Sequence, residues 1–446
     1  MSNDRRIAVI GGGITGLAAA HAALAGGAHV TLFEAGAHPG GVIRTTPFAG
    51  HPAIDEAADA FLARVPWAVQ LARAVSLGDS LTSPAAGKAA VWWDGMHDIP
   101  EGLLLGLPTD LAGLARSRLL SPRGKLRAAT EPFRARSDAT IDSIGAYVRS
   151  RFGDEVHERL VDPLIGSIYA ADTDDFSLAA APQLAELSAR SRSVLLAARH
   201  RPPAPAGPVF YAPTAGMGAL VEAVTSRLHE GGSDVRCGVT VTELAADGSS
   251  WRVDDELFDG VVLACPARNA AALLTGMQAS VATTLAAIPT AGVAMVTLAM
   301  PSTDWPSRLH GLSGYLVPKP QQRLVTAVSF GSQKWAHWSN PEHVVLRVSL
   351  GRDGLAALHL SDDQLLTEVL AELDARLGIS AAPIAVRISR WPDAFPQYRP
   401  HHGTTIATAE RALPRGITLA GASYHGIGIP ACVRSGQLAA ATLLQP

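Results

Sequence analysis

Residues 7–34 read IAVIGGGITGLAAAHAALAGGAHVTLFE, and this stretch decides the fold class. The apolar run at 7–10 is typical of a parallel strand that is buried on both faces. The pattern after it predicts a helix over 14–24 and a second strand over 29–33. These elements form one βαβ unit, so we expect an α/β fold with a Rossmann-like domain.

Three glycines, Gly11, Gly13 and Gly16, follow the first strand directly as a G-x-G-x-x-G motif. In such a motif the first glycine permits a tight turn, the second lets the backbone approach a pyrophosphate, and the third lets the helix pack on the strand. Glu34 ends the second strand, where a carboxylate can accept both hydroxyls of an adenosine ribose. A glycine turn alone can be merely structural, but with the strand, the helix and Glu34 it predicts dinucleotide binding.

A second glycine pair, Gly40 and Gly41, lies shortly after Glu34 and is followed by Arg44. An enzyme that exchanges a hydride with NAD has no need for this pair. The residues resemble the GG-x-x-R element of flavoproteins, in which the arginine follows the pyrophosphate of the cofactor. The stretch taken alone could be an ordinary loop, but together with the first motif it favours FAD.

The length and composition of the chain exclude several classes of protein. The 446 residues are too many for one core and predict two or three domains. Apolar residues make up 48% of the chain, which argues against disorder, and the formal net charge of −3 gives no overall attraction to nucleic acid. The three cysteines, Cys237, Cys265 and Cys432, are isolated, so we expect no disulfide framework, no metal site and a cytoplasmic location.

Two uncharged stretches, 7–33 and 269–303, are long enough to be mistaken for membrane spans. Glycines within the first stretch and Pro289 and Gly292 within the second would break a spanning helix. Strands, turns and short helices explain both patterns better, so we expect no transmembrane segment and no export.

The order of elements along the chain implies a discontinuous first domain. We expect a FAD-binding domain over 1–75, 210–268 and 400–446. A substrate-binding α+β domain is expected over 80–100 and 269–399, and a helical domain over 101–200.

Five further segments match a known family in order along the chain. They are DEAADAFLAR (55–64), VWWDGMHDIPEG (91–102), VDPLIGSIYAADTDDFSL (161–178), SRWPDAFPQY (389–398) and GASYHGIGIPACVRSG (421–436). With residues 1–61, they resemble the bacterial porphyrinogen oxidases of haem synthesis, within the amine-oxidase and phytoene-desaturase superfamily. The likeness is strongest to soluble forms of high-GC Gram-positive bacteria. Ala57 and Ala171 stand where the family commonly has glycine.

The resemblance implies a reaction on a reduced cyclic tetrapyrrole. Six hydrogens would be removed in three two-electron steps that use the flavin, and oxygen would take up the electrons as peroxide. The resemblance favours coproporphyrinogen III as substrate and leaves protoporphyrinogen IX as the alternative. The cofactor carries this chemistry, so few acid–base residues are needed, which fits the absence of a triad or paired-acid motif.

The C-terminal segment 416–444 is predicted to complete the cofactor site. Its strand ITLAG should return to the first sheet, and its helix should begin near the isoalloxazine ring, where the helix dipole stabilises negative charge. The residues expected to bind the cofactor are Gly11, Gly12, Gly13, Ile14, Thr15, Gly16, Glu34, Gly40, Gly41, Val42, Arg44, Ala57, Ala58, Asp59, Val239, Trp391, Ala422, Ile427, Gly428 and Ile429.

His425 is the candidate catalytic side chain, because its loop should face the flavin. It would accept a proton or steer the substrate, but a histidine that anchors the loop by hydrogen bonds is the more ordinary interpretation. Arg64 is a candidate partner for a propionate of the substrate. Tyr169 and Tyr398, with Trp391, are candidates for an aromatic pocket wall, and each could equally be core.

A basic run covers 116–137 and is normally a solvated helical face. Its cations are Arg116, Arg118, Arg123, Lys125, Arg127, Arg134 and Arg136. Alternatively, the run marks where a membrane surface or a ferrochelatase-type partner docks. The expected partners are otherwise a porphyrinogen and oxygen, without nucleic acid, for a monomer or homodimer.

Three other functions remain open at this point. An amine oxidase or carotenoid desaturase of the same superfamily would also bind flavin. A GDP-dissociation inhibitor shares the two-domain plan without redox chemistry, and a tetrapyrrole carrier would bind substrate without consuming oxygen.

Overall fold

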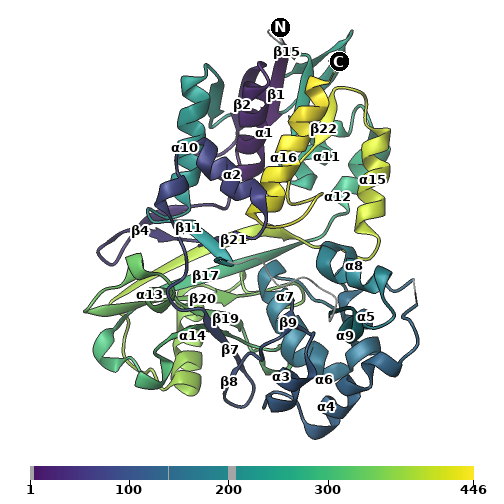
Figure 1. The fold of residues 1–446 in the computed structure, drawn as a ribbon. Coiled ribbons are helices and arrows are strands. Elements are labelled where there is room, and N and C mark those ends of the chain that lie inside the picture. The colour runs from purple at the N-terminus through teal and green to yellow at the C-terminus, as the bar shows by residue number, and fades with distance from the viewer. Residues whose placement is uncertain (1–4, 139, 199–206, 446) are drawn as a thin grey trace. The chain divides into compact units, whose positions relative to one another are not determined.

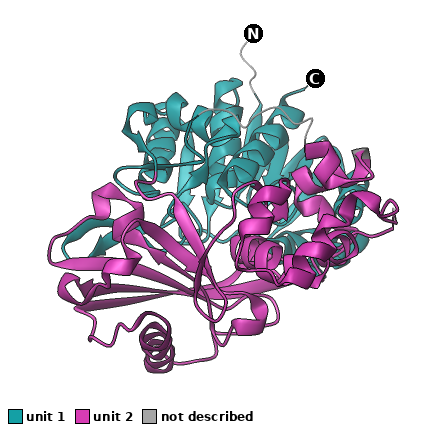
Figure 2. Cartoon of the chain, turned by 60° about the horizontal axis from the view of Figure 1, so that its bottom comes forward, with its two compact units in different colours: residues 1–83, 207–289, 403–446 teal, residues 84–206, 290–402 magenta. Residues whose placement is uncertain are grey.

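The computed structural model describes residues 5–138, 140–198 and 207–445. The described chain forms two compact units, each assembled from separate segments (Figure 2). Unit 1 consists of Met1–Ser83, Gly207–Pro289 and Gly403–Pro446, and unit 2 of Pro84–Ala206 and Thr290–His402. The predicted end of the helical domain at residue 200 lies outside the described residues.

Unit 1 is built on a five-stranded parallel sheet with the order β12-β2-β1-β16-β22 (Figure 1). Its strands are β1 (Arg6–Ile10), β2 (His29–Glu34), β12 (Asp234–Cys237), β16 (Gly260–Leu263) and β22 (Ile417–Leu419). The C-terminal strand thus joins the sheet that the N-terminal strands begin, as predicted. Because the strands are parallel, their carboxyl ends share one edge, where doubly wound sheets bind ligands.

Helices cover both faces of this sheet. On one face α1 (Ile14–Ala25) packs against α10 (Gly218–Glu230) and α16 (Ile429–Leu444). The approach of α16 to α1 is close because Gly436 has no side chain: a Cβ there would lie 2.2 Å from the carbonyl oxygen of Thr15. This contact joins the two ends of the chain.

The other face shares a hydrophobic core with more elements. Ala8, Val261 and Leu263 of the sheet are buried in that core. The elements that supply its remaining side chains include α11 (Ala267–Leu274), α12 (Ala279–Ala286), α15 (His402–Ala412) and the antiparallel strands β13 (Leu244–Asp247), β14 (Ser250–Val253) and β15 (Glu256–Phe258).

Smaller elements complete unit 1. They are the hairpin β3 (Thr45–Phe48) and β4 (His51–Asp55), the short strands β5 (Phe61–Leu62), β6 (Leu81–Thr82) and β11 (Phe210–Pro213), and α2 (Pro66–Ala74).

Unit 2 contains a seven-stranded sheet with the order β21-β17-β20-β19-β18-β7-β8. Neighbouring strands are antiparallel except β18 and β7, which are parallel. The strands are β7 (Lys88–Trp92), β8 (Met96–Asp98), β17 (Thr290–Pro301), β18 (Leu312–Leu316), β19 (Val325–Phe330), β20 (His343–Leu350) and β21 (Ala385–Pro396).

Helix α14 (Asp362–Leu377) covers one face of this sheet. Its apolar residues Leu365, Val369 and Leu373 recur at helical spacing and are buried among strand residues. Ser361 starts the helix by a capping box with Gln364, which satisfies exposed backbone N–H groups at the first turn.

The helical segment of the chain belongs to the same unit as this sheet. Its helices are α3 (Leu111–Arg116), α4 (Pro122–Ala129), α5 (Ile144–Phe152), α6 (Asp154–Val156), α7 (Asp162–Tyr169), α8 (Pro182–Arg190) and α9 (Val194–Ala198). A separate helical domain and a separate α+β domain therefore stay a prediction from the sequence. None of the described helices combines the length and hydrophobicity needed to cross a bilayer.

Candidate cofactor site

The turn between β1 and α1 is built around three glycines. Gly11 has φ +107°, and a Cβ there would lie 2.8 Å from the backbone of Ala264. A Cβ at Gly16 would lie 1.8 Å from the carbonyl oxygen of Gly11. At Gly13, by contrast, a Cβ would meet nothing within 4 Å. The turn is therefore tight against the protein at two glycines and open at the third, where a phosphate can approach the backbone.

The first turn of α1 presents unsatisfied backbone donors. Its N-cap, Gly13, has no side chain, and the turn carries no acidic residue. The N–H groups of Ile14, Thr15 and Gly16 lie where an α-helix has no carbonyl acceptor of its own. These groups and the helix dipole favour an anion at this end.

Glu34 is held in place by two backbone N–H groups. Gly12 donates to Oε2 at 2.6 Å and Gly36 donates to Oε1 at 2.7 Å. Each carboxylate oxygen keeps a further lone pair, so both can still accept from ribose hydroxyls. Val239 lies beside this residue because its N–H donates to the carbonyl oxygen of Glu34 at 2.9 Å.

The second glycine pair lies against the first motif. The N–H of Gly40 donates to the carbonyl oxygen of Gly12 at 2.8 Å, and Gly40 also forms a β-bridge with Gly13. A Cβ at Gly41 would lie 3.4 Å from Cα of Gly13. Val42 is exposed beside the pair. The two glycine motifs thus form one cradle, made mostly of backbone atoms.

Arg44 extends from this cradle with an exposed side chain. Its Nε lies 3.4 Å from Oε1 of Glu56, which is buried and also accepts from Oγ1 of Thr46 at 2.8 Å. Sequence reasoning missed Glu56. Its position within DEAADAF, next to the loop expected to face the flavin, could have marked this carboxylate as a candidate. Glu56 is thus the carboxylate that contacts the guanidinium of Arg44.

A buried aspartate anchors the hairpin before that loop. Asp55 accepts from the hydroxyl of Thr45 and from the N–H of Met217 at 2.8 Å, at the start of α10. This residue was also missed as a positioning group. Ala57, Ala58 and Asp59 follow Glu56 and are half-buried, and the exposed Arg64 lies just beyond β5. These four predicted residues lie in unit 1 with the cradle.

The C-terminal turn contacts the start of α1. Gly421 donates its N–H to Oγ of Ser435 at 2.9 Å, and a Cβ at Gly421 would lie 3.4 Å from Oγ1 of Thr15. Helix α16 then begins at Ile429 with Gly428 as its N-cap, without a side-chain cap and without an acidic residue in its first turn. Ala422 and Ile427 are half-buried in the turn. A second open helix N-terminus therefore belongs to the same unit as the first.

His425 forms a hydrogen bond to a carboxylate in this turn. Its Nε2 lies 2.7 Å from Oε1 of Glu410 on α15, and both side chains are partly exposed. The contact is of the kind expected for a histidine that anchors the loop. A catalytic role for His425 stays a prediction.

Two of the predicted substrate residues meet in the core of unit 2. Tyr169 ends α7, and Tyr398 follows β21. Both rings stack on the buried Phe176, with centroid distances of 5.3 and 5.9 Å. Burial raises the pKa of Tyr169, so this phenol stays protonated at neutral pH. Trp391 lies on β21 in the same unit.

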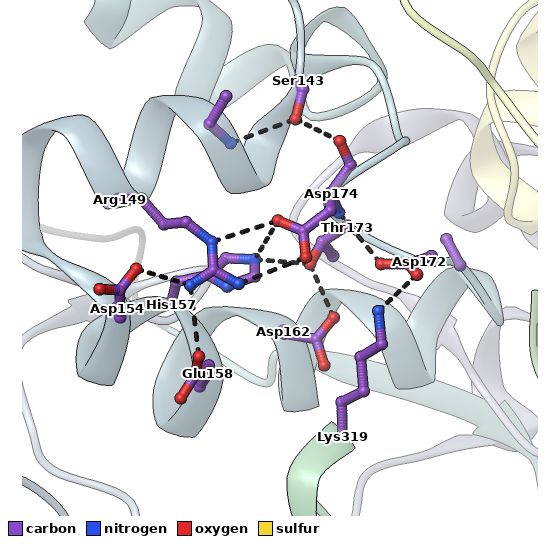
Figure 3. A network of polar contacts seen from close by, with 12 residues as sticks. Ser143, Arg149, Asp154, His157, Glu158, Asp162, Asp172, Thr173, Asp174 and Lys319 are labelled. Carbon is purple, nitrogen blue, oxygen red and sulfur yellow. Dashed lines mark hydrogen bonds and ion pairs between the residues drawn. The ribbon is translucent and has the colours of Figure 1, made fainter. Parts of the chain in front are cut away.

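The segment 161–178 takes part in a network of polar contacts (Figure 3). His157 Nε2 lies 2.8 Å from Oγ1 of Thr173, which donates to Oδ1 of Asp162 at 2.6 Å. Two guanidinium nitrogens of Arg352 donate to Asp162 at 2.7 and 3.0 Å. Burial acts to raise the pKa of Asp162, but these hydrogen bonds and the Arg352 charge hold it below its usual value.

The same network continues toward the surface of unit 2. Arg149 contacts Asp174, Asp154 and Glu158, and Lys319 contacts Asp172 (Figure 3). Because Lys319 follows β18 and Arg352 follows β20, the network fastens the helical segment to the sheet. Nowhere in the described ranges do His, Cys, Asp and Glu gather as metal ligands do.

Comparison with protein families gives one match along most of the chain. Residues 14–444 fit the family described as flavin containing amine oxidoreductase. A coproporphyrinogen III oxidase of Bacillus subtilis is 31% identical over 100% of this chain and 99% of its own length. The coproporphyrinogen III oxidase of Mycobacterium tuberculosis is 34% identical over 99% of this chain and 98% of its own.

Solved structures agree with this match. A structure from Exiguobacterium sp. 255-15, provisionally assigned as a protoporphyrinogen oxidase, superimposes with a TM-score of 0.86 at 30% identity, over 99% of this chain and 98% of its own. Cyclohexylamine oxidase from Brevibacterium oxydans has a TM-score of 0.70 at 16% identity, over 99% of both chains, and shares the fold.

Proposed function

The chain belongs to the flavin-containing amine oxidoreductases, and from this membership we propose that it oxidises coproporphyrinogen III to coproporphyrin III in haem synthesis. The observation that carries the proposal is the match of the whole chain, at 34% identity, to a relative of that name. The chain is thus an oxidoreductase. A second candidate is protoporphyrinogen IX, because a protoporphyrinogen oxidase of Macaca fascicularis is 29% identical over 77% of both chains.

We propose FAD as the flavin, since two features of unit 1 suit a long dinucleotide. The glycine cradle is open only at Gly13, beside the free N–H groups of α1, and suits a pyrophosphate. Glu34, fixed by Gly12 and Gly36, would hold the ribose, and Arg44 would follow the pyrophosphate. The open N-terminus of α16, with Ile427, Gly428 and Ile429, would lie toward the isoalloxazine ring.

A flavin held by this cradle would supply the redox chemistry, in which six hydrogens of one porphyrinogen would pass to three molecules of oxygen and give three of hydrogen peroxide. The chain's own contribution is binding and electrostatics: the positive end of the α16 dipole favours negative charge at the reduced ring. Imine–enamine shifts relocate protons within the tetrapyrrole, so no strong acid or base is required from the protein.

We also propose substrate roles for the remaining predicted residues. Arg64, whose side chain is exposed, would pair with a propionate, which a guanidinium binds well. Tyr169, Tyr398 and Trp391 would contribute apolar surface. His425, fixed by Glu410, would steer the substrate or accept a proton. We further propose a cytoplasmic protein that acts as a monomer or homodimer.

The test is an aerobic fluorescence assay in which purified flavin-loaded protein receives each porphyrinogen separately. We expect coproporphyrin fluorescence to rise faster than protoporphyrin fluorescence, with peroxide formed and no reaction without oxygen. Faster turnover of protoporphyrinogen IX would make that compound, instead of coproporphyrinogen III, the preferred substrate. No turnover of either compound, together with oxidation of an alkyl amine, would assign the chain to the amine oxidases instead.

A further inference from the structure

Helix α7 ends in a strained turn. Ala170 follows its last residue, Tyr169, with φ 47° and ψ 38°, which is the left-handed conformation. Among the eight non-glycine residues of the described chain that have positive φ, Ala170 is the one that is buried. A Cβ is disfavoured in this conformation, so helices commonly end there with glycine. An alanine stays in it where the surrounding structure holds it.

Two segments that follow strands of the unit 2 sheet hold this turn. After β20, the N–H of Asp353 donates to the carbonyl oxygen of Ala170 at 2.8 Å. After β21, Nε2 of Gln397 lies 3.4 Å from the carbonyl oxygens of both Tyr169 and Ala170. The last carbonyl groups of a helix lack acceptor partners within it, so these donors also complete the helix end. We call Tyr169 and Ala170 the α7 turn.

The side chain of Gln397 is oriented with its nitrogen toward the α7 turn. Its Nε2 also donates to the carbonyl oxygen of Phe395 at 3.0 Å, and the residue is fully buried. Its Oε1 has no hydrogen-bond partner among the described residues. A buried acceptor without a partner is unfavourable. Gln397 therefore serves this position through its N–H groups.

The α7 turn sets the direction of the Tyr169 ring. This ring stacks on the fully buried Phe176, but Tyr169 itself is half-buried. Because Tyr169 is the last residue of α7, the direction of its side chain depends on where the helix ends. A right-handed Ala170 would continue the helix and carry the carbonyl oxygens of the turn away from Gln397.

A separate contact holds the start and the middle of α7. Asp162 begins the helix and accepts from two nitrogens of Arg352 at 2.7 and 3.0 Å. The guanidinium lies close to the helix at Gly166, where a Cβ would be 2.9 Å from Nη2 of Arg352. Loss of the Gln397 contacts should therefore affect the C-terminal turn of α7 and leave the rest of the helix in place.

From these contacts we propose that Gln397 is a positioning residue for substrate binding. It holds Ala170 in the left-handed conformation and thereby directs Tyr169 toward the tetrapyrrole. The inference rests on the proposed function, in which Tyr169 contributes apolar surface to the substrate pocket. Without Gln397, the strain at Ala170 makes the turn leave this conformation for part of the time. The apparent affinity for substrate then falls in proportion to the fraction of protein that remains competent to bind.

The ordinary interpretation is that Gln397 caps the end of α7 and does nothing more. A cap of this kind contributes to stability, but its loss does not change the substrate affinity of the protein that is still folded. Glycine at position 170 separates the two roles. Because glycine adopts the left-handed conformation without strain, a turn with glycine does not need Gln397 to hold it.

The test combines steady-state kinetics on coproporphyrinogen III with equilibrium binding of coproporphyrin III to the purified, flavin-loaded protein. Gln397→Met should raise KM and the Kd of the product about fivefold. The value of kcat should stay within about twofold, because saturating substrate draws the turn into its binding conformation. Adding Ala170→Gly should restore KM and Kd. The thermal midpoint should stay below that of the wild type, since the bond to Phe395 is still missing.

Matched controls separate this turn from general effects of the substitutions. Gln322→Met removes another side-chain amide of unit 2 that donates to a backbone carbonyl, that of Val317 at 2.7 Å, and should keep the wild-type KM. Ala49→Gly places glycine at another left-handed alanine, with φ 48°, and should not rescue Gln397→Met. If Gln397→Met does not fold, Gln397→Asn replaces it, because its amide is one methylene too short to reach the α7 turn.

Two outcomes would overturn this inference and leave the proposed function in place. In the first, the wild type oxidises coproporphyrinogen III and Gln397→Met does so with an unchanged KM. In the second, the raised KM of Gln397→Met is not lowered by Ala170→Gly, so that Gln397 acts on something other than the turn. Absence of turnover of either porphyrinogen by the wild type would instead overturn the proposed function, and this inference with it.

Discussion

In unit 1 the contacts of the cofactor cradle are made largely by backbone atoms of Gly11, Gly12 and Gly40, and Glu34 adds a side chain. In unit 2 the buried network instead joins the side chains of Asp162, Thr173 and Arg352. The cradle requires glycine at positions where a Cβ would collide with neighbouring atoms, as at Gly11 and Gly16. The network needs particular side chains that lie far apart in the sequence. Mutations should therefore affect the two regions in different ways.

The largest effect should come from Arg352→Met. The substitution leaves the buried carboxylate of Asp162 without its cation, which should lower the free energy of unfolding by about 3–5 kcal/mol. Chemical denaturation measures this change. Lys319→Ala is the matched control, because its partly exposed pair with Asp172 should be worth less than about 1 kcal/mol. Loss of flavin from a variant of unchanged stability would contradict the structural role of the network.

The next effect should distinguish two glycines of one motif. Gly16→Ala would place a Cβ against the carbonyl oxygen of Gly11 and should cost about 1–3 kcal/mol of stability even without flavin. Gly13→Ala has free space within the protein, so the unfolding midpoint of the flavin-free protein should not change. Its flavin affinity, measured by fluorescence titration, should still fall because the methyl group meets the pyrophosphate. Equal flavin affinity for Gly13→Ala and wild type would show that the pyrophosphate does not bind at this turn.

A smaller change should follow Glu34→Gln. The amide keeps one acceptor oxygen, so either the bond from Gly12 or that from Gly36 is lost, and a ribose hydroxyl loses a charged partner. Flavin affinity should fall about tenfold, which corresponds to about 1.4 kcal/mol, with little change in the unfolding midpoint of the flavin-free protein. A large fall in that midpoint would mean that Glu34 is mainly a structural residue and that the cradle does depend on side chains.

The smallest effect concerns pH and the network of unit 2. Burial lowers the pKa of His157, and Arg149 lowers it further against the opposing charges of Asp162, Asp174 and Glu158. As the pH falls below about 6.5, His157 takes up a proton in the unfolded chain but not yet in the folded chain. The free energy of unfolding therefore decreases as the pH falls through that range. His157→Gln should flatten this dependence, as followed by denaturation at several pH values. An equal slope for His157→Gln and wild type would contradict the assignment.

The sequence allowed the fold of unit 1 to be predicted because its signals are local. The helix at α1 and the strands β1 and β2 agree with the predicted bounds to within one residue. The role of the C-terminal strand was also predictable, since ITLAG is a short apolar run that a parallel sheet requires. The role of Gly436 could not be predicted in this way, because it packs on Thr15 of a helix that lies far away in the sequence.

Side chains that act through distant partners were not predictable. Glu56 and Asp55 matter through Arg44 and Met217, and no spacing in the sequence links those positions. Tyr169 and Tyr398 were singled out as pocket walls, yet their stacking on Phe176 depends on a fold that brings 169, 176 and 398 together. The exposure of Phe133 was equally hidden, because a basic run does not show which of its residues face solvent.

The contact of α16 with α1 has a consequence for the order in which the protein matures. A ribosome synthesises β1 and α1 long before it synthesises β22 and α16. The glycine cradle at β1 and α1 must therefore wait for these late elements, with apolar surface of α1 still uncovered. Flavin capture should be a late event in biogenesis, so a cell short of flavin should accumulate chains that have already left the ribosome.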